Sequence, residues 1–393
     1  MLPQYYEFYN PVKIIAGNKA LESIPYELNR LNAERPLIIT DKGIVEAGLL
    51  KILVKAFRDS DIVIGAIYDD TPADSSIEVV NEIPRVYHDS QCDSLIAVGG
   101  GSVIDTAKGA NIVISEETDD IMKYSGVDRL VTPQKPLIIV PTTVGTGSEV
   151  TMAAVISDPV EKVKTPFLSS LLFPKVAILD PRMTLSLPPK LTAATGMDAL
   201  AHAIEAYSCL QKNPLSDAYA ISAVNLIREN LIKAVEDVKD GNARFAMANA
   251  SLMAGAAFSN SMVGAVHAVG HACGGIAHIH HGTAMAILLP VVMKYNLGKV
   301  AHYYAELLLP LAGDEVFAST PSSDRARRSI QTIRELNAAL SNLCGLPVSL
   351  KKSGVEESQL EEIARTAIND GSLIFNPEEV EFDDALGILK AAY

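Results

Sequence analysis

Short apolar runs alternate with amphipathic stretches over the first half of the chain. The apolar runs are rich in Ile and Val and have the length of buried strands, whereas the stretches between them repeat their apolar residues with helical period. Near-continuous apolar strands separated by helices are typical of a parallel sheet covered by helices on both faces. The predicted strands are 35–40, 61–68, 93–100, 135–143 and 174–180, and the predicted helices include 43–60 and 75–90.

The pattern changes after "SLPPK" at 186–190, where strand signals stop. Long windows rich in Ala and Leu follow with helical period, for example 215–240 and 325–344. We therefore expect α/β plus all-α architecture. Residues 1–185 are expected to form a Rossmann-like, parallel-sheet domain that binds a nucleotide, and residues 186–393 an all-helical domain.

Composition narrows the setting of this fold. The net charge of −14 argues against a nucleic-acid partner, because phosphate backbones require a basic surface. The longest apolar run, 284–293, is too short to span a bilayer, and the N-terminus lacks the features of a signal peptide. The four cysteines are far apart and form no C-x-x-C pair, which indicates reduced thiols. We expect a cytoplasmic protein that binds neither nucleic acid nor membranes.

A glycine-rich turn, "GGGSVID", follows the predicted strand 93–100. Glycines allow the backbone to approach an anion closely, and a helix that begins there offers unpaired N–H groups. Ser102 and Asp105 have the spacing of a capping box, which predicts the helix start at this point. A pyrophosphate cradle is the interpretation favoured over a tight turn without a ligand, although the spacing is not G-x-G-x-x-G.

Two further strand ends carry polar residues. The turn "PTTVGTGSE" (141–149) combines hydroxyl side chains with two glycines and is expected to form a second wall of the same nucleotide site. Asp41 follows the strand 35–40, where a carboxylate can accept hydrogen bonds from a ribose 2′-hydroxyl and repel a 2′-phosphate. The same carboxylate is equally suited to cap the next helix.

Histidines are concentrated in the second half, where five of the eight fall within "GAVHAVGHACGGIAHIHHG" (264–282). Asp198 and His202 are four residues apart on a predicted helix, and His267 and His271 repeat that spacing. Residues four apart share one helix face, as metal ligands on helices do. Two such pairs, together with His281, indicate a divalent ion such as iron(II) or zinc, and the absence of thiolates favours a catalytic ion.

These motifs resemble, in order and spacing, those of the iron-containing (group III) alcohol dehydrogenases. The resemblance rests on "GGGSVIDTAK", "PTTVGTGSEVT", "LTAATGMDALAHAIEAY", "AVHAVGHACGG" and "HHGTAMAILLP" and runs over most of the chain. It implies an NAD(P)-binding domain, a helical domain and a metal. One departure is His280, which stands where the family commonly has proline before its last metal ligand.

The resemblance also implies roles for individual residues. The implied metal ligands are Asp198, His202, His267 and His281. The implied cofactor-binding residues are Asp41, Gly99, Gly100, Gly101, Ser102, Asp105, Thr142, Thr143, Gly147 and Ser148. His271 is the candidate for relaying a proton, with a space-filling role as the alternative. Phe258 and Met152 are expected to line the substrate pocket, with core packing as the alternative for Phe258. His278 and His280 are given no role in catalysis.

The predicted function is metal-dependent, NAD(P)-linked interconversion of a primary alcohol or diol and the corresponding aldehyde or ketone. The expected cofactors are NAD, with NADP as the alternative, and Fe²⁺, with Zn²⁺ as the alternative. The alternatives for the whole chain are a metal-free relative of the maleylacetate-reductase type, a dehydroquinate-synthase-like enzyme, or a non-catalytic nucleotide-binding scaffold. A homodimer or larger homo-oligomer is expected.

Overall fold

The computed structural model describes residues 3–158 and 163–393, which divide into two compact units. The α/β unit is Asn10–Ser186, and the helical unit is Leu187–Tyr393 together with the N-terminal segment that ends at Tyr9. This division differs from the predicted ranges at the N-terminus. There the Tyr9 N–H donates to Asn260 Oδ1 at 2.7 Å and the Phe8 ring stacks on Tyr219, so the segment packs within the helical unit.

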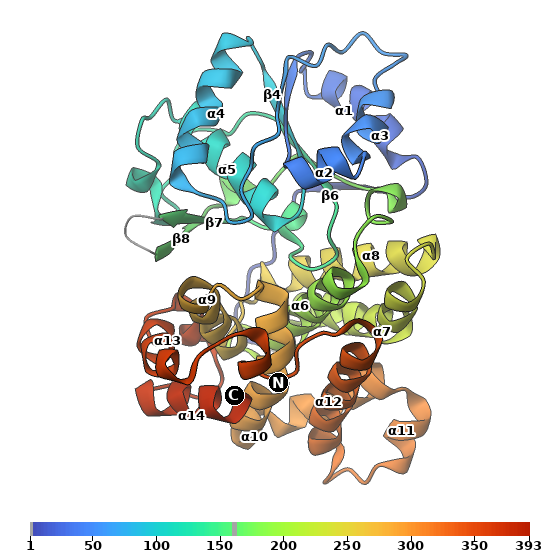
Figure 1. Cartoon of the computed structure of the whole chain (residues 1–393), viewed down its shortest axis with the longest axis vertical. Coiled ribbons are helices and arrows are strands. Elements are labelled where there is room, and N and C mark those ends of the chain that lie inside the picture. Colours follow the sequence, from blue (N-terminus) through green and yellow to red (C-terminus); the bar gives the residue numbers. More distant parts are fainter. Residues whose placement is uncertain (1–2, 159–162) are drawn as a thin grey trace. The chain divides into compact units, whose positions relative to one another are not determined.

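The α/β unit is built on a six-stranded sheet in which every pairing is parallel, in the order β1-β9-β6-β4-β2-β3. Helices α4 and α5 lie on one side of the sheet and α1 and α3 on the other (Figure 1). The strands are β1 (Lys13–Ala16), β2 (Pro36–Ile39), β3 (Ala66–Tyr68), β4 (Ser94–Gly99), β6 (Leu137–Pro141) and β9 (Val176–Leu179). The helices are α1 (Ile24–Arg30), α2 (Lys42–Glu46), α3 (Leu49–Lys55), α4 (Ile77–Asp89) and α5 (Gly101–Ser115).

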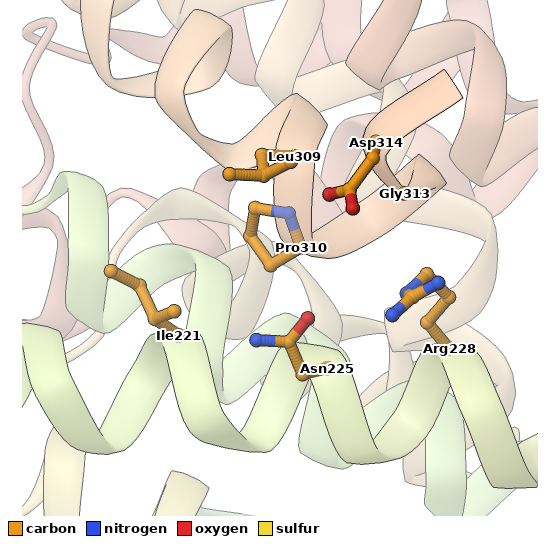
Figure 2. A pocket seen from close by; sticks show the side chains of 7 residues that line it. All are labelled: Ile221, Asn225, Arg228, Leu309, Pro310, Gly313 and Asp314. Carbon is orange, nitrogen blue, oxygen red and sulfur yellow. The ribbon is translucent and has the colours of Figure 1, made fainter. Parts of the chain in front are cut away.

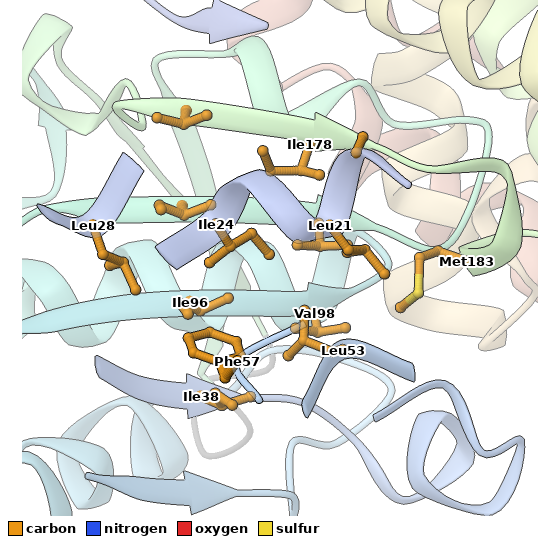
Figure 3. Close-up of a cluster of buried hydrophobic side chains, with 14 of the residues drawn as sticks. Leu21, Ile24, Leu28, Ile38, Leu53, Phe57, Ile96, Val98, Ile178 and Met183 are labelled. Atoms are coloured by element: carbon orange, nitrogen blue, oxygen red, sulfur yellow. The ribbon is translucent and has the colours of Figure 1, made fainter. Parts of the chain in front are cut away.

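Burial on both faces explains the apolar strands. Every residue of β2, β4, β6 and β9 is buried, as expected for a parallel sheet between two helical layers. Figure 3 shows Ile24 and Leu28 of α1 packed with strand residues such as Ile96 in one of these layers. The predicted fold class is therefore confirmed.

Three local features differ from the predicted pattern. The predicted helix 43–60 is two helices, α2 and α3, because Gly48 between them has a φ of 75°, which a helix interior cannot contain. β1 was not predicted. A second, three-stranded sheet has the order β5-β8-β7. Its strands β7 and β8 are antiparallel, which the predicted alternation of strands and helices did not indicate. Its strands are β5 (Gly126–Val127), β7 (Ala153–Asp158) and β8 (Val163–Leu168).

The helical unit contains nine α-helices in its described residues. The first helix, α6, begins at Pro189. Proline suits this position because the N–H groups of a helix's first turn have no partner within the helix, so nothing is lost when proline lacks one. The helices are α6 (Pro189–Ser208), α7 (Pro214–Glu236), α8 (Gly241–Phe258), α9 (Ala265–Ala277), α10 (His281–Ala312), α11 (Asp314–Ser319), α12 (Arg325–Cys344), α13 (Leu360–Ala367) and α14 (Phe382–Ala392).

Helix α10 is much longer than the apolar run 284–293, which by itself is too short to span a bilayer. By length and composition it is the one helix among the described residues that could cross a membrane. However, 61% of its most apolar window is buried inside the protein, and non-helical dihedrals at Val300 interrupt it. These features are those of a core helix.

An ion-pair cluster connects the end of β9 to the short helix η1 (Ala20–Ser23). The Asp180 carboxylate accepts from the Leu21 N–H at 3.3 Å and from the Arg182 side chain at 2.6 and 2.9 Å, and Arg182 also binds Glu22. Burial acts to raise the pKa of Asp180, but the hydrogen bonds and charge of Arg182 outweigh it and lower the pKa. The side chain is fully buried.

We predict that Asp180→Asn destabilises the protein by about 2 kcal/mol at neutral pH, because the amide removes one acceptor oxygen and the negative charge that pairs with Arg182. The native carboxylate stabilises the fold above the unfolded pKa of about 3.9, and this contribution is lost as pH falls through the lower, folded pKa. Denaturant unfolding at several pH values measures the effect. A difference between variant and native protein that stays constant down to pH 2 would contradict the assignment.

Candidate metal centre and nucleotide turns

Three histidine side chains, from three helices of the helical unit, converge on Asp198 Oδ1. The Nε2 atoms of His281 and His267 lie 3.3 and 3.8 Å from it, and His202 Nδ1 lies 3.8 Å from it. Donor atoms of Asp198, His267 and His281 all lie within 4.8 Å of one another. His202 is outside that set of three but stacks on the His267 ring at 4.3 Å. The structure thus brings the predicted ligands together.

Three of these atoms are buried without a hydrogen-bond partner. They are Asp198 Oδ1, His202 Nδ1 and His267 Nε2. A buried polar atom without a partner costs free energy, and a bound ion is one way in which native proteins satisfy such atoms. One carboxylate and three imidazoles form a donor set that suits a divalent transition metal. The residues present therefore fit a metal ion.

Close packing of α10 on α6 places the last ligand. His281 is the first residue of α10, and the following residue, Gly282, approaches α6 so closely that an added Cβ would lie 2.3 Å from the Ala194 carbonyl oxygen. Any side chain at position 282 would therefore push His281 away from Asp198. This contact explains the glycine that follows the ligand.

Glu205, one helical turn after His202, binds the predicted ligand His267. Its Oε2 lies within hydrogen-bonding distance of His267 Nδ1, and its Oε1 accepts from the Val266 N–H at 2.7 Å. A carboxylate on the outer nitrogen orients a metal-binding imidazole and raises its basicity. Sequence analysis did not assign Glu205 this role, although its i+3 spacing from His202 placed it near the same face.

The electrostatics of the site follow from burial and carboxylates. Burial lowers the pKa of His202 to about 3, which keeps that ring neutral. Burial also acts to lower the pKa of His267, but Glu205 and Asp198 outweigh it and raise the pKa to about 9. Burial acts to raise the pKa of Asp198, which the neighbouring imidazoles nevertheless hold well below its usual range. The carboxylates therefore favour a positive charge at this site.

His271 lies next to the ligands without converging on Asp198. Its ring stacks on His281 at 5.4 Å, and its Nδ1 is 2.8 Å from Asp370 Oδ2, a carboxylate that sequence analysis missed. Burial acts to raise the pKa of Asp370, but the hydrogen bond and charge of His271 lower it. Asp370 also caps the short helix η8 (Gly371–Phe375) through the Ser372 N–H. This carboxylate fixes the orientation of the His271 ring.

The remaining histidines of the cluster occupy helix ends. Helix α9 continues through Gly274 and Gly275 and stops at His278, whose φ of 53° is left-handed. The His280 carbonyl accepts from the Thr283 and Ala284 N–H groups at the start of α10. Both side chains are exposed.

The predicted pocket residues lie in different units. The Phe258 ring stacks on His202 at 4.3 Å, so it is next to the metal donors. Met152 belongs to the α/β unit, and its lining role stays a prediction. The structure also has a cavity of about 320 Å³ between α7 and the end of α10, which none of the predicted site residues lines (Figure 2). That cavity is lined by Ile221, Asn225, Arg228, Leu309, Pro310, Gly313 and Asp314.

In the α/β unit the two predicted nucleotide turns are neighbours. Their strands pair in parallel, with Gly99 opposite Pro141, and Thr142 donates its N–H to the Gly99 carbonyl at 3.0 Å. The glycines allow the close approach, since a Cβ on Gly100 would lie 3.0 Å from the Thr143 methyl. Gly147 has a φ of 59°, a left-handed conformation that favours glycine.

The predicted capping box at the start of α5 is wrong. The N-cap is Gly100, and no side chain caps this helix. Ser102 instead donates to the Ala73 carbonyl, and both oxygens of Asp105 accept from the second turn and the strand after it. Asp41 does cap its helix, because its Oδ1 accepts from the Ile44 N–H at 2.9 Å.

Comparison with known proteins decides the family. The family model described as "Iron-containing alcohol dehydrogenase" matches residues 11–181, and the model "Fe-containing alcohol dehydrogenase family, C-terminal" matches residues 192–393. The chain belongs to the iron-containing alcohol dehydrogenases. It is therefore an oxidoreductase that uses NAD and a metal, as the motifs predicted.

Relatives and solved structures cover nearly the whole chain. The NAD-dependent methanol dehydrogenase of Bacillus methanolicus is 36% identical over 98% of this chain and 99% of its own. The 1,3-propanediol dehydrogenase of Klebsiella pneumoniae is 35% identical over 96% of both chains. A solved 1,3-propanediol oxidoreductase has a TM-score of 0.94 and 34% identity, and the match covers 99% of this chain and 100% of that chain.

We predict that Glu205→Gln weakens metal binding by about 10- to 100-fold, because the amide removes the charge that orients His267 and raises its basicity. His267→Ala should lose the ion while the chain still folds. Competition with a chelator measures the affinities. Glu306→Gln is the matched control, since Glu306 accepts from the Tyr207 hydroxyl at 2.6 Å and not from a ligand. Equal affinities in the two glutamine variants would contradict the role of Glu205.

Proposed function

We propose that this enzyme binds iron(II) through Asp198, His202, His267 and His281 and interconverts primary alcohols or diols and their aldehydes or ketones with NAD(H). The observation that carries the proposal is the convergence of three buried, unpartnered donor atoms with His281. A complete donor set supports a metal enzyme over a metal-free reductase and over a non-catalytic scaffold. When bound, a divalent ion lowers the pKa of the substrate hydroxyl and polarises the carbonyl in the reverse direction.

His271 is the residue we assign to proton transfer. Its Nδ1 faces Asp370 at 2.8 Å, so a proton held on Nδ1 leaves Nε2 as the nitrogen that can accept or donate toward substrate. About a third of the side chain is exposed, which gives it a route to solvent that the buried ligands lack. Asp370 contributes by holding the ring in one orientation. The nicotinamide supplies the hydride chemistry, and the protein supplies placement.

We further propose that Gly99, Gly100, Gly101, Ser102, Thr142, Thr143 and Gly147 form the turns that hold the dinucleotide, and that Asp41 selects NAD over NADP. Asp41 stands at the carboxyl end of β2, where a 2′-phosphate would meet its charge. As a helix cap, Asp41 accepts from the Ile44 N–H through Oδ1. This single hydrogen bond does not exclude a second one between the Asp41 carboxylate and a ribose hydroxyl.

We propose a cytoplasmic homodimer or larger homo-oligomer. Four free cysteines, three of them buried, support a reducing compartment.

The charges around the metal donors favour uncharged substrates. The groups bonded to the ligands and to His271 are the carboxylates of Asp198, Glu205 and Asp370, and no Lys or Arg pairs with any of them in the described part of the chain. Burying an unpaired substrate anion beside these carboxylates would cost roughly several kcal/mol of binding free energy. Burying an added methylene group, by comparison, contributes only about 0.8 kcal/mol.

We predict that the iron-reconstituted enzyme reduces aldehydes with at least tenfold higher kcat/KM than the oxo-acids of matching length. NADH consumption measures both rates, with zinc-reconstituted and chelator-treated protein as comparisons. Loss of activity on chelation is expected if the four ligands hold a catalytic ion. A clear preference for the oxo-acid would overturn the proposed substrate class.

We predict that Asp41→Gly improves kcat/KM for NADPH relative to NADH, because it removes the charge that repels a 2′-phosphate. Asp120→Gly is the matched control, since Asp120 caps the short helix η2 (Ile121–Tyr124) through the Met122 N–H in the same unit. A cofactor ratio that changes in neither variant would show that Asp41 is a helix cap only.

A further inference from the structure

Lys108 on α5 is a fully buried cation whose donors are all used inside the protein. Its Nζ lies 2.8, 2.9 and 2.8 Å from the carbonyl oxygens of Ser148, Thr151 and Ala153. The hydroxyls of Ser148 and Thr151 are at 3.3 and 3.1 Å. An ammonium has three N–H donors, and three carbonyls consume them. Lys108 therefore has no donor left for a bound nucleotide.

Asp105, one turn earlier on the same helix face, binds the same stretch of chain. Its Oδ1 accepts from the Ser148 hydroxyl at 2.9 Å and its Oδ2 from the Val155 N–H at 3.1 Å. Together the two side chains bind the backbone or hydroxyls of residues 148–155, which join the second nucleotide turn to β7. Neither carboxylate oxygen of Asp105 is without a protein partner.

This cluster contains one buried cation, Lys108, and two carboxylates, Asp105 and Glu149. Burial lowers the pKa of Lys108 to about 8, while Asp105 and the buried Glu149 act in the opposite direction. A buried cation is retained where its partners compensate for desolvation, and removing one partner leaves an uncompensated charge. The buried charged cluster therefore binds the second nucleotide turn and the segment that follows it.

The position of that turn sets its distance from the first one. A Cβ on Gly101 would lie 2.8 Å from the Thr146 methyl, so the two turns are already in contact. Residues 148–155 continue directly from the second turn. A displacement of Ser148 would therefore move Thr146 and Gly147 relative to the start of α5.

We propose that Asp105 and Lys108 are positioning residues that anchor the second turn to α5 and so keep the two turns at the spacing a dinucleotide requires, without touching the dinucleotide. The inference rests on the proposed function of these turns. It replaces the expectation that Asp105 and Ser148 contact the cofactor directly, because the polar atoms of their side chains are occupied by each other, by Lys108 and by Val155.

The test compares Lys108→Met with Asn111→Ala in the full-length protein. Asn111 is a matched control, because it is buried on the same helix and binds the Lys135 backbone at 3.0 and 3.1 Å, before the start of β6 and away from the turns. Hydrogen exchange of residues 148–155 is measured without cofactor, and NADH affinity is measured by the fluorescence of NADH. The chain contains no tryptophan to interfere with that signal. If Lys108→Met does not fold, the double variant Asp105→Asn/Lys108→Met removes both charges together.

We expect faster exchange in residues 148–155 and weaker NADH binding, on the order of tenfold, in Lys108→Met, with neither change in Asn111→Ala. Unchanged exchange, equal losses in both variants, or faster exchange with native NADH affinity would each overturn the inference. Native protein that binds no NADH would instead refute the proposed cofactor site. The exchange comparison would still decide whether Lys108 anchors the turn.

Discussion

The arrangement of the proposed metal site depends on one buried carboxylate, Glu205, which binds both the start of a helix and a proposed ligand. Glu205 accepts from the backbone at the start of α9 and binds the outer nitrogen of His267, so the direction of the helix and the rotation of the ring are set by the same group. The N-cap residue of α9, Gly264, provides no side-chain cap. Asn376 provides a second substitute for the missing cap, because its side-chain oxygen accepts from the Ala265 N–H at 3.1 Å. Helix ends need such partners, and here distant residues provide them.

The α/β unit uses the same physical arrangement with the opposite charge. Lys108 is a buried cation surrounded by backbone carbonyls, just as Glu205 is a buried anion bound to a backbone N–H group and an imidazole. A buried ion is costly unless its hydrogen bonds are complete, and for that reason it defines a backbone position more narrowly than apolar contacts do. Each proposed site is therefore positioned by a buried charged side chain, Glu205 or Lys108, that need not contact substrate or cofactor.

Much of this organisation could be predicted from the sequence. Apolar runs predicted the buried strands, and the i, i+4 spacing together with the family motifs predicted the residues that converge on Asp198. The supporting residues could not be predicted, because their contacts join distant parts of the chain. Asp370 is 99 residues from His271, and Lys108 is 40 residues from Ser148. A hydrophobic pattern records which face of an element is buried but not which polar group another element brings to it. The capping-box prediction failed for this reason, since Asp105 has partners that lie 43 and 50 residues away.

The N-terminal segment gives the chain a nested topology. The α/β unit is one continuous stretch, whereas the helical unit is assembled from both ends of the sequence. During synthesis Phe8 and Tyr9 emerge long before Tyr219 and Asn260, their contacts in α7 and after α8. The α/β unit can complete its sheet while those aromatic residues are still without partners, because domains generally fold as units in the order of synthesis. In topological terms, the α/β unit is inserted between the N-terminal segment and the remainder of the helical unit.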